Sequence, residues 1–209
     1  MIHRKISCYT KCFFTVFMAL FIPGYWIGYG PLNFLWFSDI ILIMTFFATL
    51  FESRFLASMA AVGGFISLSL WNVDFFFTLL APLFDIKLAG FTAYIFSSEY
   101  PVWLRTLSLF HVALPFFLLW LIYRLGYHKW AWVFQIVFFW IVIPITWFVT
   151  DPSKNINGVF SYKIYKWLNI EATFFLIIEF VVVAIVIAVS HLFFKTLIKK
   201  LSNKFIRKK

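Results

Sequence analysis

Ser38, Asp39 and His111 are the residues of this sequence with the clearest capacity for chemistry, because each lies within an apolar stretch. An imidazole changes charge near neutral pH and can act as a general base, and a neighbouring carboxylate can tune it. A serine hydroxyl becomes a nucleophile when a base takes its proton. We therefore treat these three as candidate catalytic residues. In the alternative interpretation His111 is a helix-packing histidine, and the Ser38 hydroxyl bonds its own backbone.

A second set of polar residues lies in or beside the apolar stretches. An ionised group in contact with lipid is disfavoured by about 2.5 kcal/mol or more, so each is expected to face a partner or a water-filled cavity. The set comprises Asn33, Asp74, Arg105, Ser108, Asp151, Asn155 and Glu179. We predict that these residues line a polar pocket together with the catalytic candidates. The alternative is purely structural pairing, for which Asp74 with Arg105 is the first candidate.

The sequence predicts no metal site and no cofactor. The residues that could supply nitrogen and oxygen ligands lack the short His and Asp spacing of metalloproteases. These residues are Asp39, Asp74, His111 and Glu179. The P-loop, the dinucleotide-binding glycine motif and the GxSxG elbow of hydrolases are also absent from the sequence.

The elements that must position these residues are helices that cross a membrane. Hydrophobic residues make up 64% of the 209 residues and charged residues 12%, against roughly 25% charged in soluble domains. Six apolar stretches approach or exceed the roughly 20 residues that one crossing needs. The expected helices cover residues 12–30, 33–51, 55–80, 102–124, 130–150 and 172–194. The sequence thus predicts an all-α, polytopic transmembrane helical bundle.

Most of the 18 Lys and Arg residues fall on one side of this arrangement. Basic segments stay in the cytoplasm, so both termini are predicted to be cytoplasmic in a multi-pass protein of the inner (plasma) membrane. The chain then divides into a basic N-terminus (1–11), a single six-helix membrane domain (12–194) and a basic tail (195–209). The tail is expected to bind anionic lipid headgroups, at about 1 kcal/mol per basic residue. Nucleic acid is not an expected partner, and the sequence identifies no protein partner.

The crossing pattern brings the candidate residues to one half of the membrane. The second expected helix runs inward, which places Ser38 and Asp39 roughly 8 Å deep at a rise of about 1.5 Å per residue. The fourth also runs inward and places His111 roughly 14 Å deep. Arg105, Ser108 and His111 share one face of that helix. We therefore predict an outward-facing polar pocket, with membrane lipids as partners.

Three strings of the sequence resemble a family of uncharacterised bacterial polytopic membrane proteins with six helices. They are residues 31–39 (PLNFLWFSD), residues 108–112 with Pro115, and residues 150–157 (TDPSKNIN). The resemblance covers most of the chain. It implies a six-helix inner-membrane protein and supplies no activity.

A more distant resemblance rests on Ser38 in the second apolar helix and His111 in a later one. An apolar helix with a small nucleophile, followed by a helix with histidine, is similar to the androgen-induced-protein family of intramembrane threonine/histidine lipid hydrolases. Its cysteine/histidine acyltransferase relatives share the pattern. By this resemblance Ser38 takes the place of the nucleophile and His111 that of the base. This sequence departs from those families by its serine and by the additional charge of Asp39.

The first functional hypothesis is an intramembrane Ser/His enzyme, a hydrolase or an acyltransferase, that acts on an acyl ester of a membrane lipid. In this hypothesis Ser38 attacks the ester, His111 takes the proton of the hydroxyl, and Asp39 orients the imidazole. Asn33 or Arg105 stabilises the oxyanion. A serine hydroxyl close to an imidazole nitrogen, facing a slot that lipid can enter, would favour this hypothesis.

The second hypothesis is a protein without enzymatic activity. It is either a structural subunit of a membrane complex or a small proton-coupled carrier. Carboxylates that line a path through both halves of the membrane would favour the carrier. The residues available to it as proton or cation sites are Asp39, Asp74, His111 and Glu179.

Overall fold

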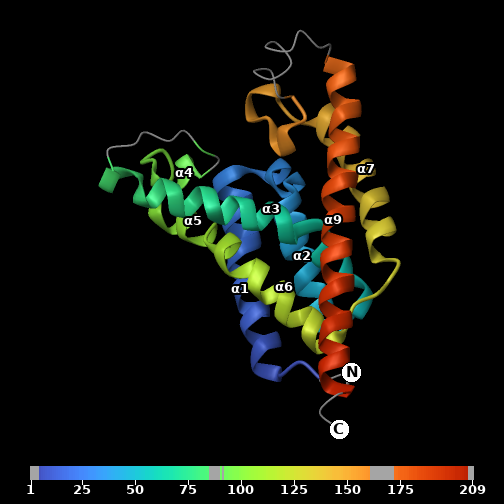
Figure 1. The fold of residues 1–209 in the computed structure, drawn as a ribbon. Helices are drawn as coiled ribbons and strands as arrows, with labels where there is room; N and C mark the ends of the chain where they lie inside the picture. The colour runs from blue at the N-terminus through green and yellow to red at the C-terminus, as the bar shows by residue number, and fades with distance from the viewer. Residues whose placement is uncertain (1–4, 85–89, 91, 161–171, 207–209) are drawn as a thin grey trace.

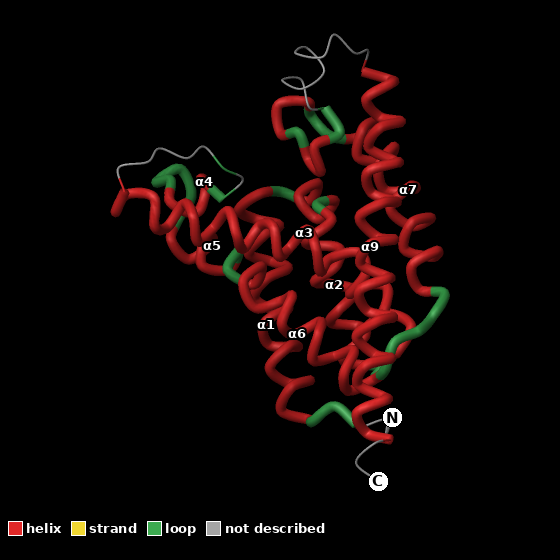
Figure 2. The backbone as a smooth tube through the Cα atoms, in the orientation of Figure 1, coloured by secondary structure: helices red, strands yellow, loops and turns green. Residues whose placement is uncertain are grey.

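The computed structural model describes residues 5–84, 90, 92–160 and 172–206, which form helices joined by short connectors (Figure 1). No strand occurs among these residues (Figure 2). The predicted all-α bundle is therefore confirmed. Helices satisfy their backbone polar groups internally, which is what a hydrocarbon environment requires of a spanning chain.

The helices follow one another with short turns and two longer connectors. Short 3-10 segments, labelled η, flank several of them. In chain order the described elements are α1 (Cys8–Tyr29), η1 (Pro31–Leu35), α2 (Phe37–Leu50), α3 (Arg54–Leu80), η2 (Ala81–Phe84), α4 (Ala93–Phe96), α5 (Val102–Leu107), α6 (Phe110–Leu125), α7 (Ala131–Val149), η3 (Pro152–Lys154), η4 (Ile156–Gly158) and α9 (Ala172–Ile206).

Five helical stretches are long and apolar enough to cross a membrane. About 20 residues suffice for a hydrocarbon core of about 30 Å. The stretches are Cys8–Tyr29, Arg54–Phe84, Val102–Leu125, Ala131–Val149 and Phe174–Lys200. They make the chain a multi-pass membrane protein.

The second apolar stretch forms a shorter helix than the predicted one over 33–51. Its first part is the 3-10 segment η1, and Trp36 then adopts an extended backbone with ψ 131° before α2 begins at Phe37. The 14 residues of α2 rise about 21 Å at about 1.5 Å each, which is less than the hydrocarbon core. The break therefore places Ser38 and Asp39 in the first turn of a helix.

The fourth predicted helix is divided in two. Ser108 and Leu109 form a turn between α5 and α6. The amide of His111 bonds the Ser108 carbonyl at 3.2 Å, which is a 3-10 rather than an α-helical bond. His111 thus begins a new helix, and the turn before it exposes the Ser108 carbonyl to its side chain.

The last helix is longer than the predicted range of 172–194. α9 continues to Ile206 because Leu197 and Ile198 still pack against the core. Most of the basic tail predicted for 195–209 therefore extends this helix. Figure 1 shows the start of α1 and the end of α9 at the same end of the bundle. This arrangement agrees with the prediction that both ends of the chain lie on one side of the membrane.

α3 lies at the centre of the bundle and packs against α2, α6, α7 and α9. Two adjacent glycines let its neighbours approach closely. A Cβ atom on Gly64 would lie 2.6 Å from Cγ2 of Ile41 on α2, and one on Gly63 would lie 2.7 Å from Nε2 of Gln135 on α7. Small residues at contact positions let helices pack closely in lipid, where the hydrophobic effect contributes little free energy to helix association.

Replacing Gly64 with leucine should destabilise the bundle by about 1–3 kcal/mol, because the new side chain overlaps Ile41 and forces α2 away from α3. Ala113→Leu is the matched control, since Ala113 is exposed on α6. Thermal unfolding of the purified proteins in detergent measures the difference. Equal unfolding temperatures for the two variants would contradict this account of the α2–α3 contact.

The bundle widens toward the end opposite the termini. α4 and α5 lie on one side there, while α7, α9 and the η3–η4 segment lie on the other (Figure 1). η1 and the first turn of α2 lie close to α7 and η4. The space between these groups of elements contains the site described next.

Candidate functional site

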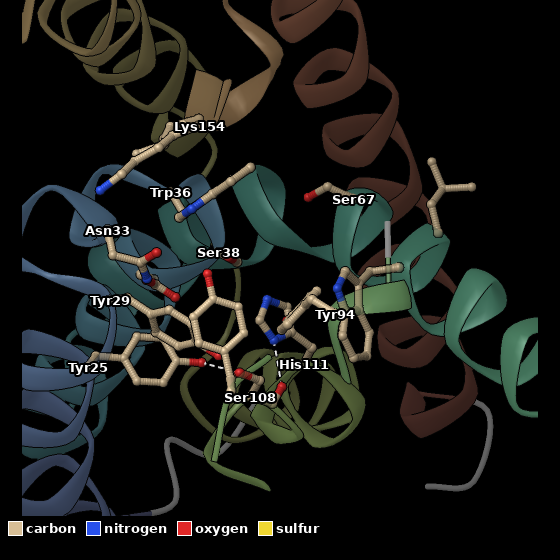
Figure 3. Close-up of a pocket in the computed structure, with 16 residues that line it drawn as sticks. Tyr25, Tyr29, Asn33, Trp36, Ser38, Ser67, Tyr94, Ser108, His111 and Lys154 are labelled. Atoms are coloured by element: carbon tan, nitrogen blue, oxygen red, sulfur yellow. Dashed lines mark hydrogen bonds between the residues drawn. The ribbon is translucent and has the colours of Figure 1, made fainter. Parts of the chain in front are cut away.

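A cavity of about 740 Å³ opens where the bundle widens. It receives side chains from α1, η1, α2, α3, α4, α6 and the loop after α7 (Figure 3). Its lining consists of Tyr25, Gly28, Tyr29, Asn33, Trp36, Ser38, Asp39, Ser67, Leu70, Trp71, Tyr94, Tyr100, Ser108, His111, Lys154 and Ile156. The volume lies within the range of about 300–1,000 Å³ that is usual for small-molecule sites.

All three catalytic candidates line this one cavity. Ser38 and Asp39 come from the first turn of α2, and His111 from the start of α6. Two of the predicted pocket residues, Asn33 and Ser108, line it as well. The fold has thus brought the group formed by Asn33, Ser38 and Asp39 to the group formed by Ser108 and His111, from a distant part of the chain.

His111 is held in a fixed orientation. Its Nδ1 lies 2.7 Å from the Ser108 carbonyl oxygen, and the residue is 6% exposed. A carbonyl can only accept, so Nδ1 carries the hydrogen of the neutral ring and Nε2 keeps its lone pair. The imidazole also stacks on Trp71, with centroids 4.5 Å apart and planes 17° apart, and lies 4.0 Å from the Phe110 ring. These contacts leave Nε2 as the basic atom of the ring.

Ser108 connects α1 to this arrangement. Its hydroxyl lies 2.6 Å from the Tyr25 hydroxyl (Figure 3), and both residues are buried. The side chain of Ser108 thereby ties α6 to α1, while its carbonyl holds His111. The predicted role of Asp39 in orienting the imidazole is therefore filled by the Ser108 carbonyl.

Asp39 is 1% exposed and pairs with Asn33 instead of His111. The Asn33 amide Nδ2 donates to Oδ2 of Asp39 over 2.9 Å. Within the described part of the chain, no hydrogen bond joins Ser38, Asp39 and His111 to one another. Asp39 lies in the first turn of α2, where the positive end of the helix dipole favours a carboxylate.

Asp74 and Arg105, predicted for the pocket, do not line it and do not pair with each other. Asp74 accepts hydrogen bonds of 2.8 Å from the backbone amide and from the hydroxyl of Thr92. Arg105 donates to the Ile95 carbonyl over 2.7 Å. Both side chains thus fasten the connector around α4 to the bundle. Both were predicted at the depth of the pocket, but their partners Thr92 and Ile95 belong to this connector.

Asp151 and Asn155 shape the loop after α7 and also lie outside the lining. Asp151 accepts from the Ser153 amide at 2.7 Å, and hydrogen bonds with the side chain and then the backbone of Ser153 lower the pKa of the exposed carboxyl. The Asn155 side chain accepts from the amide of Phe160 at 2.8 Å. Lys154 between them does reach the cavity. Glu179 is half-buried on α9 and is not among the lining residues.

Asn157 is a positioning residue that the sequence analysis overlooked. Its Nδ2 donates to the Leu35 carbonyl and its Oδ1 accepts from the Phe37 amide, each over 2.8 Å. These bonds hold the joint between η1 and α2, and so fix the turn that carries Ser38. The Asn-Gly pair at 157–158 was the available signal, since Asn157 adopts the left-handed backbone (φ 55°) that asparagine tolerates.

Aromatic side chains form most of the remaining wall, and sequence analysis also missed them. They line the same cavity as Asn33 and Asp39. They are Tyr25, Tyr29, Trp36, Trp71, Tyr94 and Tyr100. The spacing of Tyr25 and Tyr29, four residues apart on one helix face, was the signal in the sequence.

The carrier hypothesis receives less support from this geometry. Of its four proposed proton or cation sites, only Asp39 and His111 line the cavity. Asp74 is held by Thr92. Among the described residues, no group of three or more His, Cys, Asp and Glu side chains is arranged to hold a metal ion.

Comparisons with protein-family models, with curated proteins and with solved structures found no match to this chain.

Proposed function

We propose that the chain is an intramembrane hydrolase or acyltransferase that acts on an acyl ester of a membrane lipid, with Ser38 as nucleophile and His111 as general base. One observation carries this proposal. The His111 ring is fixed through Nδ1 by a backbone carbonyl, which leaves Nε2 as its basic atom, and His111 and Ser38 line the same cavity. Acyl transfer requires a base whose ring is held by a third group and a nucleophile that shares its site.

The reaction would proceed in two steps. In the first, the Ser38 oxygen attacks the ester carbonyl while its proton passes to Nε2 of His111. The tetrahedral intermediate collapses, the ester bond breaks, and the leaving alcohol takes the proton from the imidazolium. In the second step water or an acceptor alcohol gives its proton to Nε2 of His111 and attacks the acyl-serine. The bond between the acyl carbon and the Ser38 oxygen then breaks, the imidazolium returns the proton to that oxygen, and the acid or a new ester is released.

Asn33 is the candidate for stabilising the oxyanion. One hydrogen of its amide is used by Asp39, and the other is available to a substrate in the cavity. The backbone amides of Phe37, Asp39 and Ile40 in the first turn of α2 already donate to Asn157 or Trp36, so the amide side chain of Asn33 is the donor that we assign. Arg105, the other predicted candidate, donates to Ile95 and does not line the cavity.

The membrane placement proposed from the basic residues fits this activity. In this placement both termini lie on the cytoplasmic side of the inner membrane. The cavity, at the opposite end of the bundle, then lies in the outer half of the bilayer. The exposed side chains of Lys195, Lys199 and Lys200 on the last turns of α9 then face anionic headgroups of the inner leaflet. Each basic residue near such a surface contributes about 1 kcal/mol.

Comparative lipid profiling tests the proposed activity. Cells expressing the wild-type protein should contain a lipid product that is lost in both Ser38→Ala and His111→Ala, because each change removes one member of the reacting pair. Ser69→Ala is a matched control, since its hydroxyl bonds the Phe65 carbonyl at 2.6 Å and does not line the cavity. The control should retain the product. Unchanged lipids in the two site variants, at equal protein levels, would reject the activity.

A further inference from the structure

The carboxylate of Asp39 has hydrogen-bonding capacity that the other residues of this chain do not fill. An ionised carboxylate has two oxygens that can each accept hydrogen bonds, and here Asn33 supplies a donor to only one of them. No lysine, arginine or histidine among the described residues forms an ion pair with Asp39. The side chain is nevertheless almost completely buried, and Asp39 is one of the residues that line the cavity. A buried carboxylate can carry its charge when a cation pairs with it, and a positively charged group of a ligand in the cavity would supply that partner.

The surrounding walls suit a cation that carries carbon substituents. Tyr25, Tyr29, Tyr94 and Tyr100 line the cavity together with Trp36. The faces of tyrosine and tryptophan rings attract ammonium groups, and several such rings around one site are the usual way to bind quaternary or primary ammonium ligands. Trp71 is engaged elsewhere, because its ring stacks on His111.

One basic side chain completes the charge pattern. Lys154 is exposed on the loop after α7 and still reaches the lining of the cavity. It comes from a different element than Asp39, which lies at the start of α2. A ligand with one negative and one positive group would satisfy both residues, whereas an anionic ligand would leave Asp39 unpaired.

We propose that the cavity recognises the zwitterionic headgroup of a phospholipid, with its ammonium group at Asp39 and the tyrosines and its phosphate at Lys154. This inference rests on the proposed function and names the substrate class of the same site. Binding of the headgroup brings the acyl esters of that lipid to the cavity that holds Ser38 and His111. Anionic phospholipids, which lack the ammonium group, bind more weakly.

Calorimetric titration with short-chain lipids below their micellar concentration tests the headgroup preference. Dihexanoyl phosphatidylethanolamine and phosphatidylcholine should bind the Ser38→Ala protein at least about tenfold more tightly than dihexanoyl phosphatidylglycerol, as a charged contact with cation–π support predicts. Ser38→Ala is used because it prevents turnover while keeping the headgroup contacts. Equal or tighter binding of phosphatidylglycerol would overturn the inference.

Asp39→Asn, added to the Ser38→Ala protein, should remove this preference by weakening the two zwitterionic lipids to the level of phosphatidylglycerol. Asp74→Asn is the matched control, because Asp74 bonds Thr92 outside the cavity, and it should keep the preference. A preference that survives Asp39→Asn would contradict the proposed contact. If this variant fails to fold, the comparison of the three lipids with Ser38→Ala alone decides.

The inference and the proposed activity fail in different ways. Selective binding of zwitterionic lipids together with an unchanged lipid profile in Ser38→Ala would reject the activity and keep the headgroup site. A product lost in Ser38→Ala but derived from an anionic lipid would keep the activity and reject the headgroup site.

Discussion

Replacing His111 with glutamine is expected to lower kcat for the acyl lipid by roughly 10²–10⁴-fold, the usual contribution of a positioned general base. Glutamine has similar length and can still occupy the space between Trp71 and Phe110, but it cannot take the proton of the Ser38 hydroxyl. The KM should change little, because the imidazole acts on the reacting atoms and contributes little to ground-state binding. Steady-state kinetics of the purified proteins in lipid nanodiscs measure both constants.

His191→Gln is the control for this substitution. His191 bonds the Tyr127 hydroxyl at 2.6 Å from α9 and is not among the residues that line the cavity. Its replacement should leave kcat within a factor of about two, whatever its effect on stability. A His111→Gln protein that folds and turns over at the wild-type rate would exclude His111 as the base.

Replacing Ser38 with alanine should lower kcat by roughly 10⁴–10⁶-fold, because the acyl group then has no covalent acceptor on the protein. The double variant Ser38→Ala/His111→Gln should be no slower than Ser38→Ala alone. When two residues act as one unit, the losses of kcat from the single substitutions do not add in the double variant. Once the nucleophile is removed, the base has no hydroxyl proton to accept. The same nanodisc assay compares the three proteins.

Additive losses in the double variant would show that the two residues act independently. In that case His111 would serve a water molecule or another hydroxyl, and Ser38 would have a separate role. Ser38→Cys provides a further check, because a thiol can also attack an ester and should restore part of the activity that alanine abolishes.

The membrane-spanning helices were predictable because lipid imposes a minimum length of apolar residues on every crossing. The predicted range 55–80 and the observed α3 (Arg54–Leu80) differ by a single residue at the start. The start of α2 was not predictable in this way. Hydropathy continues smoothly across Trp36, whereas the backbone there is extended and Asn157 from a distant loop holds it.

The sequence predicts how far along its helix each candidate residue lies, but not toward which neighbouring helix its side chain points. Ser38 and His111 were placed in the same half of the membrane by counting residues along their helices, and they line one cavity. Asp74 and Arg105 passed the same depth criterion, yet they hold the α4 connector at Thr92 and Ile95. The direction of a side chain depends on how helices rotate and tilt against one another, and hydropathy does not contain this information.

The aromatic lining shows a second limit of sequence reasoning. In a chain where 24% of the residues are aromatic, a tyrosine such as Tyr94 cannot be distinguished by type from those that anchor helices at the membrane surface. Only the packing of α4 beside α5 brings Tyr94 to the cavity. The predicted role of Asp39, to orient the imidazole of His111, was wrong for a similar reason. The packing places the Ser108 carbonyl, and not Asp39, within hydrogen-bond distance of His111.

Labelling with a fluorophosphonate probe tests most directly whether Ser38 is a nucleophile that His111 activates. The serine oxygen of an activated site attacks phosphorus and displaces fluoride, which leaves a stable adduct on that residue. Mass spectrometry of the wild-type protein should find the adduct on Ser38, and His111→Gln should lose it while Ser69→Ala keeps it. An unlabelled Ser38 beside a fully labelled serine hydrolase in the same preparation, or labelling of Ser38 that persists in His111→Gln, would contradict the account.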